Sequence, residues 1–141
     1  MSTSIIRIIT CLVLIIHGIG HAMAFFPALN IFSTDKWHYR SWLLPGFLGD
    51  TVSRVLVMIL FGAAFLGFIT AGLGLFSWLV PHSAWQTLAI ISAVVSLVAL
   101  GLFWNSFASL FPNKIGAIAV NVATLWALLG SGSFSEIIKN L

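Results

Sequence analysis

Two histidines lie four residues apart inside an apolar segment near the start of the chain. The segment runs from Ile5 to Phe26, and its one charged residue, Arg7, is near its beginning. If the segment is helical, His17 and His21 lie about 40° apart around the axis and about 6 Å apart along it. Ionisable side chains inside such segments are rare and are candidate functional sites.

This spacing allows both imidazoles to bind one metal ion, as helical H-x-x-x-H pairs do. It is poor for holding one haem from both faces, because the two axial ligands would have to come from opposing helices. One histidine can still serve as a single axial ligand, and a neutral imidazole can donate a hydrogen bond to a quinone carbonyl. The ligand classes that the sequence leaves open are therefore a quinone, a haem and a metal ion.

Further residues are expected to join the histidines at this site. Gly18 and Gly20 flank the histidine face and leave room for a bulky group near the backbone. The predicted cofactor-binding residues are His17, His21, Gly18, Gly20 and Asn121.

A metal ion would need donors from outside the first segment. His21 lies toward the end of the segment that enters a long polar loop, and His38 and Asp50 are on that side. The predicted metal ligands are therefore His17, His21, His38 and Asp50. His82 is in a loop at the opposite side of the membrane, so we expect it to stay outside the cluster.

A purely structural role for the histidines remains open beside the functional one. A buried histidine can be satisfied by Ser96, Asn121 or a backbone carbonyl, and glycines near it can mean only close helix packing. Asp50 and Arg54 are four residues apart, so they are expected to pair at the start of a helix.

The composition of the chain is that of a membrane protein. Of its 141 residues, 60% are hydrophobic and only 6% are charged, whereas a soluble domain has about a quarter charged residues. Six basic and three acidic residues are too few and too scattered to form a nucleic-acid-binding patch. Cys11 is the only cysteine, which excludes an intrachain disulfide and a CxxC pair.

Four apolar stretches are predicted to span the bilayer, at about 5–26, 52–79, 85–104 and 114–129. The chain is thus expected to be one all-α membrane domain, residues 1–141, built as a four-helix bundle with a long first loop. Arg7, the first apolar run and Ala22-Met23-Ala24 also resemble a cleaved signal peptide. We expect a retained helix instead, because cleavage would discard both histidines.

Each predicted helix carries a stripe of small or polar residues, which favours close packing in a membrane. The predicted inward faces are Thr10, His17, Gly20, His21 and Ala24; Ala63, Gly67, Thr70 and Gly74; Trp85, Ala89, Ser92, Ser96 and Ala99; and Lys114, Ala117, Asn121 and Thr124. The histidines are therefore expected to point into the bundle. The basic residues are divided almost evenly between the two sides, so the orientation in the membrane stays open.

The first segment resembles the DoxX-like family of small four-helix bacterial membrane proteins. Arg7, His17, Gly18 and His21 occupy the positions of that family's membrane-edge arginine and His-Gly-x-x-Lys-like helix turn, with His21 where the family usually has lysine. The resemblance implies a bacterial inner-membrane subunit near quinone-linked sulfur or oxidative-stress chemistry.

Two functions follow from the sequence. The first is a redox-linked membrane subunit whose histidine pair contacts a quinone, haem or metal. The second is an accessory or assembly subunit without chemistry of its own, whose partners are the lipid bilayer and either other membrane subunits or further copies of itself. The sequence has no nucleophile elbow, phosphate-binding glycine loop or zinc signature, so it identifies no catalytic residue and leaves open whether the protein is an enzyme.

Overall fold

The computed structural model describes residues 2–31, 41–43, 49–106 and 113–141. In these ranges the chain is all-α and has no strand, as predicted. The helices are α1 (Thr3–Ala28), α2 (Asp50–Gly74), α3 (Trp85–Leu102), α4 (Ile115–Leu129) and α5 (Ser133–Lys139). Two short 3₁₀ turns, His82–Ala84 and Trp104–Ser106, flank α3.

The long helices are suited to a bilayer. Among the described residues, three helices are long and apolar enough to cross a membrane, and a fourth span results if α4 and α5 count as one. These two helices meet at an angle of 89°. The chain is therefore a small integral membrane protein that contacts lipid. The predicted long first loop contains residues 32–40 and 44–48, which lie outside the described residues.

The second helix ends earlier than predicted, at Gly74 instead of residue 79. The amides of Phe76 and Ser77 donate to the carbonyls of Leu73 and Gly74, both at 3.0 Å, and Ser77 has a φ of 58°. A helix cannot continue through this left-handed turn. Gly74 leaves room for this turn, because a Cβ there would lie 2.9 Å from a methyl group of Val80 and 3.2 Å from the Cβ of Trp85.

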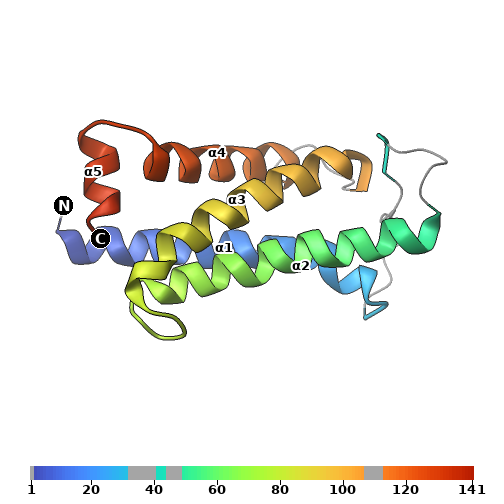
Figure 1. Ribbon diagram of the computed structural model, residues 1–141, viewed down its shortest axis with the longest axis horizontal. Helices are drawn as coiled ribbons and strands as arrows, with labels where there is room; N and C mark the ends of the chain where they lie inside the picture. The colour runs from blue at the N-terminus through green and yellow to red at the C-terminus, as the bar shows by residue number, and fades with distance from the viewer. Residues whose placement is uncertain (1, 32–40, 44–48, 107–112) are drawn as a thin grey trace.

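The four long helices pack in chain order, α1 on α2, α2 on α3 and α3 on α4 (Figure 1). Glycines bring α1 and α2 together: a Cβ on Gly62 would lie 2.8 Å from the Phe25 ring, and one on Gly72 would lie 2.8 Å from Ile15. The contact is therefore closest at backbone positions that carry no side chain, as is common where lipid supplies no hydrophobic drive for association.

The predicted inward stripe is confirmed on α3 and wrong in part on two other helices. All five predicted α3 residues are buried. On α2, however, Ala63 is exposed, and the buried face is formed by larger residues such as Phe61 and Phe68. Phenyl rings fill the space between α1 and α3, so residue size alone did not identify this face. On α1, Gly20 is exposed while His21 and Ala24 are buried.

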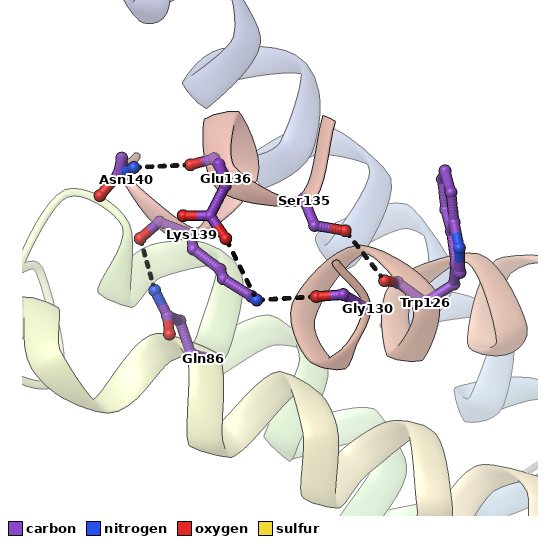
Figure 2. A network of polar contacts seen from close by, with 7 residues as sticks. All are labelled: Gln86, Trp126, Gly130, Ser135, Glu136, Lys139 and Asn140. Carbon is purple, nitrogen blue, oxygen red and sulfur yellow. Dashed lines mark hydrogen bonds and ion pairs between the residues drawn. The ribbon is translucent and has the colours of Figure 1, made fainter. Parts of the chain in front are cut away.

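The C-terminal helix α5 folds back onto the end of the bundle instead of extending away from it (Figures 1 and 2). Gln86 of α3 donates to the Lys139 carbonyl at 2.7 Å, and the Lys139 ammonium donates to the Gly130 carbonyl at 2.8 Å. Arg7 of α1 donates to the Leu141 carbonyl. Ile138 and Leu141 are buried in the core, so α5 closes the end of the molecule where both termini lie.

Candidate functional site

Four side chains from three helices form a buried chain of hydrogen bonds in the middle of the bundle. Nε2 of His17 lies 2.9 Å from Oδ1 of Asn121 on α4. Nδ2 of Asn121 donates to Oγ of Ser96 on α3 at 2.6 Å, and this hydroxyl lies 3.0 Å from Nε2 of His21. His21 is 3% exposed, and Ser96 and Asn121 are fully buried. The two histidines of α1 are thereby tied to both α3 and α4.

The amide of Asn121 sets the direction of this chain when both imidazoles are neutral. Its Oδ1 can only accept, so Nε2 of His17 carries the hydrogen and donates. Ser96 accepts from Asn121 and has one hydrogen left, which it can give to Nε2 of His21. His21 then carries its own hydrogen on Nδ1, whereas Nδ1 of His17 carries none and can accept.

The two Nδ1 nitrogens thus have opposite character. Turning the Asn121 amide round would reverse every bond of the chain and exchange the two roles, but it would still leave one Nδ1–H and one bare Nδ1. The hydrogen bonds of both rings within the described residues use Nε2. The pair therefore has one Nδ1–H donor and one bare Nδ1 acceptor.

Phenyl rings of α2 hold the two imidazoles in place. The ring of Phe68 lies 4.7 Å from His17 in an edge-to-face contact and 6.0 Å from His21 in a stacked one. The His17 and His21 rings themselves meet edge to face at 4.9 Å. Contacts of this kind fix ring orientation, so both imidazoles are preorganised.

The two glycines of the motif have different surroundings. A Cβ on Gly18 would lie 3.0 Å from the Phe65 carbonyl oxygen of α2, so this glycine serves close helix packing. A Cβ on Gly20 would meet no atom within 4 Å. The predicted space beside the histidines therefore exists at Gly20, and at Gly18 it is filled by α2.

A cleft of about 450 Å³ opens beside the histidine pair. It lies between α1 and α4, and its walls include His17, Gly20 and His21 on one side and Gly116 and Ala117 on the other. Leu100 of α3 forms part of its inner wall. The cleft is largely apolar, and among the described residues that line it the ionisable ones are the two histidines. Its volume suits a small ring-shaped ligand.

Asp50, the one additional predicted metal ligand among the described residues, is not grouped with the histidine pair. His38 lies outside the described residues, and Asp50 lies in the first turn of α2. Arg54, its predicted partner, donates from Nε to the Ala28 carbonyl at the end of α1, at 2.5 Å. In the part of the chain that the structure describes, no three His, Cys, Asp or Glu residues are grouped to hold a metal ion. His82 is exposed in the turn before α3, at the other end of the bundle.

The sequence pattern indicates the α4 wall of the cleft only in part, through Ala117. Ser96 and Asn121 were recognised as possible partners of buried histidines, but Gly116 was not assigned to any inward face. Its signal was available, since Gly116 lies one helical turn before Val120, and residues at this spacing share a face. Comparison of the chain with known protein families, with curated proteins and with solved structures finds no match.

Proposed function

We propose that this membrane protein binds a quinone in the cleft between α1 and α4, with His17 and His21 contacting the quinone oxygens. The observation that carries the proposal is the cleft itself, which reaches both imidazoles while their Nε2 atoms are held by Asn121 and Ser96. The protein would thus act as a small redox-linked membrane subunit, as the DoxX-like pattern of the first helix also implies.

The chemistry of the pair suits both redox states of a quinone. A quinone carbonyl accepts a hydrogen bond, which an imidazole N–H donates, whereas a hydroquinone hydroxyl donates one, which a bare imidazole nitrogen accepts. The pair provides one group of each kind. The surrounding cleft is apolar, which favours a lipid-soluble ring.

A quinone is favoured over the other two ligand classes by the state of the imidazoles. A metal ion or haem iron needs a nitrogen lone pair directed at it, and a metal ion held by two histidines needs further donors. The chain of hydrogen bonds leaves a bare Nδ1 on only one of the two rings, and no third donor is grouped with them in the described residues. Hydrogen bonding to a quinone requires no additional ligand.

Quinone content of the purified protein tests the proposal. The protein is isolated in lipid nanodiscs, extracted with organic solvent and analysed for quinone, with an absorption spectrum and metal analysis of the same sample. We expect quinone at about one molecule per chain and neither a haem Soret band nor stoichiometric metal. Stoichiometric haem or metal would overturn the proposal in favour of that ligand.

Two matched variants locate the bound quinone. Gly20→Phe places a ring in the cleft, whereas Ile19→Phe changes the neighbouring residue, which is exposed on the outer surface of α1. Gly20→Phe should abolish quinone retention, and Ile19→Phe should leave it intact. If both variants retain quinone as the wild type does, the ligand lies elsewhere. If the wild type retains none, the accessory-subunit alternative is favoured.

A further inference from the structure

A second cleft continues the first toward the end of the bundle that α5 closes. It has a volume of about 400 Å³ and also lies between α1 and α4. Val13 of α1 and Val120 of α4 line both clefts. Since the two spaces meet at the same pair of side chains, they form one groove along the α1–α4 boundary.

The groove follows one face of each helix. On α1 its lining residues recur every three or four positions from Ile6 to Met23, a rise of about 26 Å along the axis. This length approaches the hydrocarbon thickness of a bilayer, about 30 Å. On α4 the opposing residues include the small side chains of Ala123 and Thr124, which leave the space open.

The distal part of the groove differs chemically from the histidine end. Its lining side chains are apolar except for Thr10 and Thr124. At its far end Trp126 stacks on Phe134 of the α5 helix, with ring centres 5.5 Å apart, and Ile138 lines the same space. Figure 1 shows α5 running from the end of α4 toward the start of α1. The distal part is thus an apolar groove that begins at a polar pair and ends at α5.

We infer that the ligand is a quinone with a long hydrocarbon tail, whose ring lies beside His17 and His21 and whose tail lies in the distal groove toward α5. This inference rests on the proposed function. The axial rise from His17 back to Ile6 is about 17 Å, which accommodates an extended tail of more than ten carbon atoms. Because the two clefts are continuous, one molecule with a ring at one end and a tail at the other can occupy both.

The tail is tested with two probes and a matched pair of variants. The probes are a benzoquinone headgroup without a tail and the same headgroup with a decyl tail, each titrated against the purified full chain in nanodiscs. Thr124→Phe fills the distal groove, whereas Val122→Phe makes the same change in size on the exposed side of α4.

Thr124→Phe should raise the Kd of the decyl-tailed probe about tenfold, the loss expected when about two methylene groups lose their contacts. It should leave the Kd of the tail-less probe unchanged, which also shows that the variant is folded. Val122→Phe should change neither Kd. Equal effects of Thr124→Phe on both probes, or no effect on either, would overturn the inference while leaving the proposed function standing. Failure of the wild type to bind either probe would overturn the proposed function itself.

A photoreactive tail gives an independent readout of its position. A decyl-tailed benzoquinone that ends in a diazirine is irradiated with the wild-type protein, and the labelled residues are identified by mass spectrometry. We expect labels on Ile6, Ile9, Phe134 or Ile138, at the α5 end of the groove. Labels confined to the outer face of α4 would show that the tail lies in bulk lipid, and displacement of the probe by phospholipid alone would identify an acyl chain as the occupant.

Discussion

Ser96 is the residue on which the two halves of the buried polar chain depend. Its hydroxyl accepts from Asn121 and faces Nε2 of His21, so it links the α4 side of the site to the second histidine. A hydrogen bond between membrane helices contributes about 0.6 kcal/mol on average and up to about 1.7 kcal/mol. Removing a residue that takes part in two such contacts should therefore lower the free energy of unfolding by a measurable amount.

Replacing Ser96 by alanine should lower the free energy of unfolding by about 1–2 kcal/mol, because it leaves Asn121 and His21 each short of one partner. Ser92→Ala is the control, since Ser92 is buried on the same face of α3, one turn earlier and outside the chain. The free energy of unfolding of each variant is measured in mixed micelles that contain increasing amounts of a denaturing detergent. A loss for Ser92→Ala as large as that for Ser96→Ala would contradict the importance of the chain.

The two glycines of the histidine motif should respond oppositely to alanine. Gly18→Ala brings a methyl group within 3.0–3.2 Å of Phe65, Phe68 and Ile69, which should cost about 1–3 kcal/mol of stability through overpacking. Gly20→Ala meets nothing and should be neutral or stabilise the helix by about 0.5–1 kcal/mol. Thermal unfolding of the two variants in the same detergent measures this difference in stability. A similar Tm for both would refute the assignment of Gly18 to helix packing.

At the scale of elements, α5 is held by contacts from helices distant in sequence. A helix of seven residues is too short to be stable alone in water, so its order depends on its docking. Gln86 of α3 and Arg7 of α1 hold its last residues by side chain to main chain bonds, and Ile138 and Leu141 supply buried apolar contacts. The α5 residues Phe134 and Ile138 line the end of the groove only while these contacts last.

Gln86→Ala should loosen α5 without unfolding the bundle. Loss of one hydrogen bond, about 1 kcal/mol, should speed amide exchange in α5 about fivefold while exchange in α1 and α2 stays the same. Thr87→Ala, at the neighbouring exposed position of α3, is the control. Hydrogen exchange with mass spectrometry gives the rates. Unchanged exchange in α5 would mean that the apolar contacts alone hold it.

At the scale of the whole molecule, the antiparallel packing of α1 and α2 fixes which loops share a side of the membrane. The chain starts at one end of the bundle, and the turn between α2 and α3 returns to that end, as does α5 (Figure 1). The start of α2 and the turn after α3 lie at the other end. The exposed apolar faces between the two ends contact lipid, which accounts for residues such as Ile16, 66% exposed.

Single cysteines in a Cys11→Ser background should report these two sides. Ser83→Cys lies in the turn before α3, and Asn105→Cys lies in the turn after it. In sealed membranes an impermeant thiol reagent should modify one of the two and spare the other, because α3 separates them. Both should react once the membranes are permeabilised. Modification of both in sealed membranes would show that α3 does not cross the bilayer.

The apolar runs of this sequence determined an all-α membrane protein by themselves, because a bilayer admits only segments that satisfy their own backbone hydrogen bonds. The spacing of His17 and His21 placed both on one helical face for the same reason. Their partners depend on how three helices pack. Only the tertiary structure shows that Ser96 and Asn121 join the two imidazoles in one chain, that Gly18 is filled by α2, and that the cleft opens at Gly20. Helix period fixes which residues share a face, but the space between two helices is decided by side chains from all the helices that surround it.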